Sequence, residues 1–182
     1  PRKRKARTIL TFSIPTMKVK SLERSGNQLR YIDQTALPVA LVYKETGDYR
    51  QIIEAIKRLE IRGAPAIGIA AAYALAIATA KSGRFERDEF LSIAAEVKAS
   101  RPTAVNLFWA VDRVVSKVQS LETCGFDEIL LALWAEASAI HEEDRQMCAR
   151  IGALGATLIK DGATILTHCN TGALATGGIG TA

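Results

Sequence analysis

A chain of 182 residues with 48% hydrophobic and 24% charged residues has the composition of an ordinary globular protein and is long enough to bury a full core. Five of its 24 basic residues lie in the first seven positions, and the 19 that remain equal the 19 acidic residues. The body of the chain is therefore neutral, which argues against nucleic acid or an anionic membrane surface as a partner.

The cysteines and the apolar runs limit the class of protein further. Cys124, Cys148 and Cys169 form an odd set without the spacing of metal ligands. This usage is typical of a reducing cytosol, so we expect a cytoplasmic protein without zinc or another bound metal. The apolar run that comes nearest to a membrane span, residues 64–80, is at the lower edge of the necessary length, and its many alanines favour a buried helix.

The first folded element is predicted to be a β-hairpin. Residues 17–22 and 28–33 alternate between apolar and polar side chains, and Ser25-Gly26-Asn27 between them has the composition of a turn. A third strand is predicted over residues 41–45, after the break at Pro38. The chain therefore begins with a small antiparallel sheet.

Two helices are predicted to follow the sheet. Asp48 is a suitable N-cap for a helix whose apolar residues recur at spacings of three and four, namely Ile52, Ile53, Ile56 and Leu59. That helix ends before Arg62, and a second begins at Ala64, with Pro65 in the first turn, where a missing N–H costs nothing. Seven alanines between residues 70 and 80 make the second helix thin, so we expect it to pack closely and to lie centrally.

Three further helical patterns cover residues 85–100, 103–121 and 127–160. Thr103 is the predicted cap of the middle one, because Arg101 precedes a proline and is biased towards extended geometry. The last pattern is long, and we interpret His141 and Asp144 on it as part of a solvated face.

The last twenty residues look least like ordinary core. Residues 163–167 are an apolar, β-branched run after a turn at Asp161-Gly162, which predicts a buried strand. His168 and Cys169 follow at its end, and the small residues beyond them predict a helix capped by Asn170 or Thr171. A strand that runs into a helix places the joining residues at the carboxyl edge of a sheet, where open α/β folds bind ligands.

Cys169 is therefore a candidate functional residue. The free amides of a helix start favour negative charge, which lowers the pKa of a nearby thiol and offers a seat for phosphate. The alternative is that Cys169 is simply a small buried residue. His168 is interpreted as structural, because side chains alternate along a strand and its own points away from that of Cys169. The glycines contain no G-x-G-x-x-G, so neither NAD nor another cofactor is predicted.

Together these elements predict two structural units. Residues 17–160 form an α+β N-terminal domain with a small antiparallel sheet and a helical layer. Residues 161–182 form the opening strand and helix of a Rossmann-like α/β domain that is truncated at Ala182.

Anion capture at a helix start is a recurring theme, at Arg62-Gly63-Ala64, at Arg101-Pro102-Thr103 and at Cys169–Gly172. Taken alone, an arginine in such a place is more often a surface ion partner. However, residues 62–68 (RGAPAIG), 101–107 (RPTAVNL) and 165–176 (ILTHCNTGALAT) resemble, in order and spacing, three motifs of the methylthioribose-1-phosphate isomerase family.

The resemblance extends from about Met17 to Ala182, which corresponds to the first half of a family member. It favours the interpretation of the basic tail, residues 1–16, as a remnant that is not native to the protein. The alternative is a nuclear signal or a polyanion-binding arm.

The resemblance implies conversion of 5-methylthioribose 1-phosphate into 5-methylthioribulose 1-phosphate in methionine salvage, without a cofactor. It implies that Cys169 is catalytic and that the substrate is bound, around its phosphate, by Arg62, Gly63, Ala64 and Arg101. The family's second catalytic residue is an aspartate in the remaining C-terminal half, so the 182 residues alone are expected to be inactive, and family members are usually homodimers. Two alternatives stay open, a ribose-1,5-bisphosphate isomerase and a non-catalytic regulatory subunit of the translation initiation factor 2B type.

Overall fold

The computed structural model describes residues 19–121 and 123–181, so the basic tail predicted over residues 1–16 lies outside the described residues. Three strands form one antiparallel sheet in the order β1-β2-β3: β1 (Leu22–Ser25), β2 (Gln28–Ile32) and β3 (Tyr43–Thr46). The predicted hairpin is confirmed, although its first strand begins only at Leu22, and the third strand begins two residues and ends one residue later than predicted. Gly26 makes the hairpin turn at a φ of 59°, a left-handed conformation that glycine adopts without strain.

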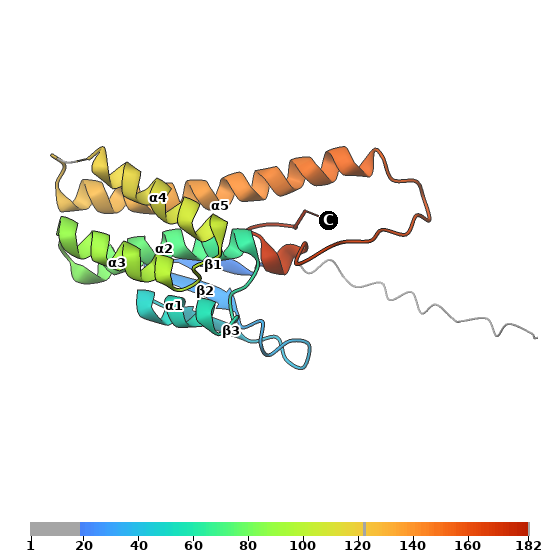
Figure 1. Ribbon diagram of the computed structural model, residues 1–182, viewed down its shortest axis with the longest axis horizontal. Coiled ribbons are helices and arrows are strands. Elements are labelled where there is room, and N and C mark those ends of the chain that lie inside the picture. The colour runs from blue at the N-terminus through green and yellow to red at the C-terminus, as the bar shows by residue number, and fades with distance from the viewer. Residues whose placement is uncertain (1–18, 122, 182) are drawn as a thin grey trace, which may run out of the picture.

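Helices occupy the positions predicted for them in the described ranges: α1 (Tyr49–Lys57), α2 (Ala64–Ser82), α3 (Arg87–Ala99), α4 (Val105–Gln119) and α5 (Phe126–Ala156). Figure 1 shows α3, α4 and α5 packed around α2, with the sheet and α1 on the other side of α2. The chain is therefore an α+β unit, as expected from its sequence.

The start of α1 follows the prediction and its end does not. The Asp48 side chain accepts a hydrogen bond from the Arg50 amide at 2.9 Å and so caps the helix. Leu59, predicted on the buried face, lies beyond the last turn at a φ of 63° and is exposed. The helix ends before the apolar repeat does, because the next three residues turn the chain towards α2.

The alanine-rich helix α2 lies at the centre of the protein. Every side chain from Ala66 to Thr79 is buried, on all sides of the helix. In length and hydropathy α2 would also pass for a membrane span, but 78% of it is buried inside the protein, as in a core helix. The predicted central position is confirmed, and the membrane alternative is not needed to explain its composition.

Close packing between α2 and α4 depends on Gly68. A Cβ atom at this position would lie 2.8 Å from the Asn106 carbonyl oxygen, closer than real Cβ atoms come to backbone. The two helix backbones therefore touch where α4 begins, and this contact fixes the position of the 101–107 stretch against the start of α2.

We predict that Gly68→Ala destabilises the protein by about 1–3 kcal/mol, because the added methyl group must push α4 away from α2. Gly155→Ala is the matched control, since Gly155 lies near the end of α5 and a methyl group added there would have no other atom within 4 Å. The control should be neutral or stabilising by up to about 1 kcal/mol, because alanine is the better helix former. Urea denaturation of both variants measures the difference, and equal stabilities would contradict the close packing.

Residues 161–181 do not form the predicted strand and helix. Residues 163–170 are exposed and irregular, with Leu166 98% exposed, and the only helical turn that follows in the described residues is the three-residue 3₁₀ turn η1 (Ala173–Ala175). A strand needs a neighbouring strand for its backbone hydrogen bonds, and the described residues place none beside this run. The transition into a Rossmann-like domain is therefore absent from the described structure.

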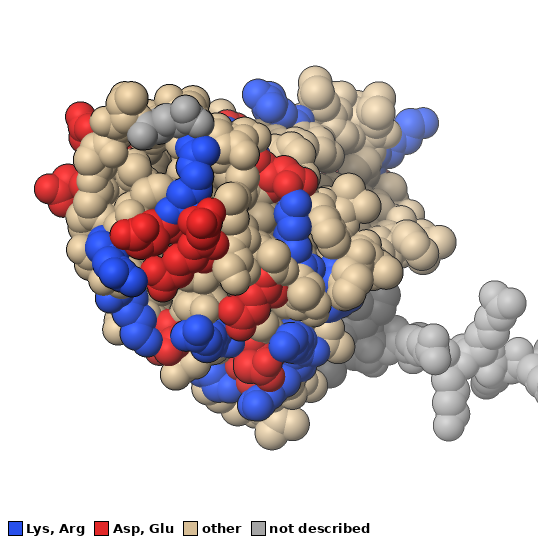
Figure 2. Space-filling view, turned by 60° about the vertical axis from the view of Figure 1, so that its left-hand side comes forward, with Lys and Arg blue, Asp and Glu red and all other residues tan. Residues whose placement is uncertain are grey.

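The surface agrees with a neutral body. On the face shown in Figure 2, acidic and basic side chains are intermixed, with no single-sign patch. Many of them pair with each other; for example, Arg113 bridges Glu136 at 2.5 Å and Glu143 at 2.5 Å. Among the described residues on this face there is no basic patch or stripe of the kind that binds phosphate backbones.

Candidate functional site

The chain returns to the start of α2 after α5 ends. Residues 157–170 run back along the molecule, and the segment 171–181, here called the returning segment, packs beside α2 (Figure 1). Ser21 Oγ donates a hydrogen bond to the Thr176 carbonyl at 2.6 Å, and Gln34 Nε2 donates to the Leu174 carbonyl at 2.7 Å. These contacts join the end of the described chain to its first strands.

Helix α5 holds the same segment from the opposite side. The Gly177 amide donates to Asp144 Oδ2 at 2.7 Å, and His141 Nε2 lies 3.0 Å from the Gly177 carbonyl oxygen. Asp144 is buried and His141 is partly buried. The interpretation of these two residues as a solvated helix face is therefore wrong. The returning segment covers them.

The contacts of His141 define the tautomer of its neutral form. A carbonyl oxygen only accepts, so Nε2 must carry the proton, and neutral His141 then accepts at Nδ1 from the Tyr73 hydroxyl, 3.2 Å away. Burial lowers the pKa of His141 below its ordinary value of 6.5, while the Gly177 carbonyl and the Asp144 and Glu142 carboxylates partly offset that effect. The folded protein therefore favours the neutral imidazole.

We predict that the protein loses stability as the pH falls from 7 to 5, because the unfolded state takes up a proton on His141 that the folded state resists. Carboxylates with lowered pKa values, such as Asp33 and Asp48, contribute mainly below pH 5, because the ordinary pKa of an aspartate is 3.8. Thermal unfolding across this range should show a smaller loss for His141→Gln, whose amide stays neutral. His168→Gln, a change at an exposed position, should retain the wild-type slope, and the same slope in all three proteins would refute the assignment.

Gly63 is needed where the returning segment meets α2. Its φ is 97°, and a Cβ atom there would lie 2.4 Å from the Ala175 Cα. The side of Gly63 that a side chain would occupy is therefore filled by Ala175. This packing requires glycine whether or not the Gly63 amide also binds a ligand.

We predict that Gly63→Ala costs about 3 kcal/mol or more, because left-handed strain adds to the collision with Ala175. Gly83→Ala at the end of α2 is the matched control, since Gly83 has a φ of 67° but open space around it. It should cost only the strain, about 1–2 kcal/mol. In Gly63→Ala alone, hydrogen exchange at the Gly177 amide should also become faster. Unchanged exchange there would contradict the role of Gly63 in seating the segment.

A hollow of about 630 Å³, here called the Cys169 hollow, lies between the returning segment and the loops after β2. Its lining consists of Val19, Gln34, Leu37, Leu41, Arg62, Cys169, Asn170, Thr171, Gly172, Ala173, Leu174 and Ala175. The structure thus brings together two of the predicted site residues, Arg62 and Cys169, which are 107 positions apart in sequence. Cys169 is exposed, with a φ of 62° that is uncommon for a residue with a side chain.

The predicted electrostatic activation of Cys169 by a helix start does not hold in this structure. The predicted helix after Cys169 is absent, and η1 is too short to align enough peptide dipoles for a substantial field. The candidacy of Cys169 depends instead on its place in the hollow with Arg62.

The other predicted substrate-binding residues are placed differently. Ala64 is exposed at the first position of α2, beside Gly63, so both lie next to Arg62. Arg101 is partly buried four residues before α4 and does not line the Cys169 hollow. The structure therefore groups Arg62, Gly63 and Ala64 near Cys169, and it leaves Arg101 apart.

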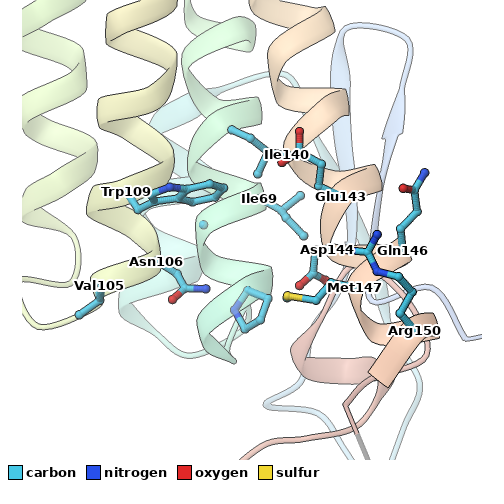
Figure 3. A pocket seen from close by; sticks show the side chains of 12 residues that line it. Ile69, Val105, Asn106, Trp109, Ile140, Glu143, Asp144, Gln146, Met147 and Arg150 are labelled. Atoms are coloured by element: carbon cyan, nitrogen blue, oxygen red, sulfur yellow. The ribbon is translucent and has the colours of Figure 1, made fainter. Parts of the chain in front are cut away.

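A second hollow of about 530 Å³ lies between the starts of α2 and α4 and the middle of α5. Figure 3 shows Trp109 and Asn106 of α4 directed towards Met147 and Asp144 of α5, with Ile69 of α2 between them. Trp109 is half-exposed in this groove. Neither Arg62 nor Cys169 lines it, so it is a separate feature.

Sequence reasoning missed three residues that hold the site together: Gln34, His141 and Asp144. Asp144 follows Ile140 and precedes Cys148 at four-residue spacing, and both of those are buried. That stripe is the signal that could have identified Asp144. Within residues 19–121 and 123–181, no cluster of three or more His, Cys, Asp or Glu side chains is arranged to hold a metal ion.

Residues 60–182 match the initiation factor 2 subunit family, and the chain belongs to that family. It is 45% identical over 172 residues to the methylthioribose-1-phosphate isomerase of Geobacter metallireducens, an alignment that covers 91% of this chain and 49% of that protein. The chain spans about half the length of the curated relatives it matches.

Two solved structures resemble the fold. The 5-methylthioribose 1-phosphate isomerase of Pyrococcus horikoshii superposes with a TM-score of 0.82 at 37% identity, over 88% of this chain and 46% of that one. The delta subunit of translation initiation factor eIF-2B from A. fulgidus superposes with a TM-score of 0.73 at 35% identity, over 87% of this chain and 47% of that one. The fold is thus shared by a protein named as an isomerase and a protein named as a translation initiation factor subunit.

Proposed function

We propose that the full-length protein is an aldose-ketose isomerase that converts 5-methylthioribose 1-phosphate into 5-methylthioribulose 1-phosphate in methionine salvage. The observation that carries the proposal is that Arg62 and Cys169 line one hollow, which is large enough for a small sugar phosphate. Identity of 45% to proteins named for this activity supports the choice of substrate.

The hollow offers the groups that such a substrate needs. The Arg62 guanidinium can bind phosphate oxygens through two parallel N–H bonds, and the backbone of Gly63 and Ala64 lies beside it at a helix start. In this scheme Arg101 joins the phosphate site only in the full-length protein, since it lies outside the Cys169 hollow here.

The reaction has a particular chemical difficulty. Phosphate on the anomeric oxygen prevents the sugar from opening to a free aldehyde, as an ordinary aldose does. Isomerisation must break the ring C–O bond at C1, move one hydrogen from C2 to C1, and pass the hydroxyl proton of C2 to the released ring oxygen as C2 becomes a carbonyl, so no atom is gained or lost. The hydrogen travels either as a proton, which needs an acid and a base, or as a hydride, which needs a dry pocket with ordered charges. Cys169 is assigned to proton transfer or to placement of the reacting carbons.

The second acid or base is expected in the half of the protein that corresponds to the rest of its relatives. Asp144 is unsuited to that role, because its carboxylate accepts the Gly177 amide and is buried beneath the returning segment. We also propose that residues 163–167 form the first strand of a Rossmann-like α/β domain once that half is present, which would give this apolar run its neighbours.

The test is an isomerase assay on the full-length protein, with ketose formation followed by phosphorus and proton NMR. Turnover of 5-methylthioribose 1-phosphate is the expected result. A preference for ribose 1,5-bisphosphate would overturn the substrate assignment, and no turnover of either sugar would favour a regulatory subunit of the initiation factor 2B type. Residues 1–182 alone should be inactive, and full activity in them would refute the need for a second half.

We predict that Cys169→Ser lowers kcat by about 10²-fold or more, because a hydroxyl is a far weaker acid than a thiol. Cys124→Ser is the matched control, since Cys124 lies between α4 and α5, at the end of the helices remote from the hollow (Figure 1). The control should keep wild-type turnover. Retention of wild-type kcat in Cys169→Ser would show that the sulfur takes no part.

We further expect the full-length protein to be a cytoplasmic homodimer without a cofactor. Light scattering of the purified protein measures the assembly state, and a monomer at assay concentrations would contradict the dimer.

A further inference from the structure

Gln34 is a buried polar residue at the edge of the Cys169 hollow. It follows β2 and is only 4% exposed, and its backbone amide donates to the Glu60 carbonyl at 3.0 Å. Its side-chain amide forms hydrogen bonds through both the oxygen and the nitrogen. Arg62 Nε donates to Gln34 Oε1 at 3.1 Å, while Gln34 Nε2 donates to the carbonyl oxygen of Leu174 at 2.7 Å and to that of Arg62 at 3.4 Å.

The hydrogen-bond partners of the Gln34 side-chain amide allow only one orientation of that amide. Arg62 Nε carries a proton and can only donate, and the Leu174 carbonyl oxygen can only accept. Turning the amide over would place two donors face to face and two oxygens face to face. A buried side chain with all its polar atoms matched in this way is held in one rotamer.

This arrangement fixes the direction of the Arg62 guanidinium. The guanidinium is planar, so a hydrogen bond at Nε sets the plane in which the two terminal nitrogens lie. In the described part of the chain, no other group accepts from those nitrogens. They are therefore left for an anion in the hollow, at the edge that suits two parallel bonds to phosphate.

We propose that Gln34 is a positioning residue that aims Arg62 at the substrate phosphate and ties it to the segment that carries Cys169. The proposal rests on the proposed isomerase function, because it assigns the phosphate of that substrate to Arg62. It adds a coupling between the two parts of the site. The side-chain oxygen of Gln34 binds Arg62, and its side-chain nitrogen binds the Leu174 carbonyl, five residues beyond Cys169.

The test is a double-mutant cycle in the full-length protein, with Gln34→Leu, Arg62→Ala and the double variant. With Arg62 present, Gln34→Leu should raise KM for the sugar phosphate about tenfold and change kcat less than about threefold, since the Gln34–Arg62 hydrogen bond acts on substrate binding. In the Arg62→Ala background it should raise KM less than about twofold, because its partner is gone. A purely structural role would give equal effects in both backgrounds, and that result would overturn the proposal.

Two further variants keep the test decisive. Gln34→Asn keeps a polar side chain but is one methylene too short to reach both partners, so it should reproduce the effect of Gln34→Leu and serves if the leucine variant does not fold. Gln28→Leu, at the exposed start of β2, is the matched control and should leave KM unchanged. A raised KM in the control, or an unchanged KM in both Gln34 variants, would refute the proposal.

Titration with inorganic phosphate separates this proposal from the proposed function. Calorimetry of the same variants should show weaker phosphate binding in Gln34→Leu only when Arg62 is present. If the wild type binds phosphate with this coupling but turns over neither sugar, the isomerase assignment fails and the positioning role stands. A wild type that does not bind phosphate, or a coupling of zero, would overturn the positioning role itself.

Discussion

The close approach of neighbouring backbones to α2 is the constraint on which the rest of the structure depends. A helix with alanine or glycine at most positions lets its neighbours come within contact of its main chain. At Gly68 the neighbour is the first turn of α4, and at Gly63 it is η1 of the returning segment. Because interiors are packed at nearly crystalline density, these contacts allow little displacement. The start of α2 thus fixes segments that are remote in sequence.

The candidate site is assembled on that fixed point, from both ends of the described chain. Ser21 and Gln34 reach the returning segment from the sheet side, and His141 and Asp144 reach it from α5. All four bonds involve backbone groups of residues 174–177. The side chains matter there only through their small size, since a Cβ atom at Gly177 would lie 2.4 Å from the His141 Cδ2. This explains how a run as featureless as Leu174-Ala175-Thr176-Gly177 is held in one conformation beside Arg62.

The sequence predicted local structure well and long-range structure poorly, for identifiable reasons. Asp48 and the isoleucines after it define α1 through interactions within a few residues, so they can be read directly. Residues 163–167 have the composition of a strand, but pairing depends on a partner that the sequence cannot name. His141 and Asp144 look solvated among their charged neighbours Glu142 and Glu143, because the segment that buries them lies 33 to 36 residues away. For the site, the motifs predicted Arg62 and Cys169, while a role for Gln34 could be inferred only once its two partners were seen in space.

Three strongly exposed leucines lie along the part of the chain that leads to Cys169, and this bears on how the hollow is completed. Leu154, Leu158 and Leu166 are all more than 70% exposed on the far half of α5 and on the chain that returns from it. Single exposed leucines are ordinary, but a succession of them on one excursion of the chain is typical of a surface that another part of the protein covers. Cys169 lies three residues beyond Leu166, so whatever buries that leucine also limits where the sulfur can lie. The stretch that carries Cys169 thus borders an exposed apolar run, whereas the Arg62 guanidinium is held by the buried side chain of Gln34, so the two sides of the hollow are supported by different parts of the chain.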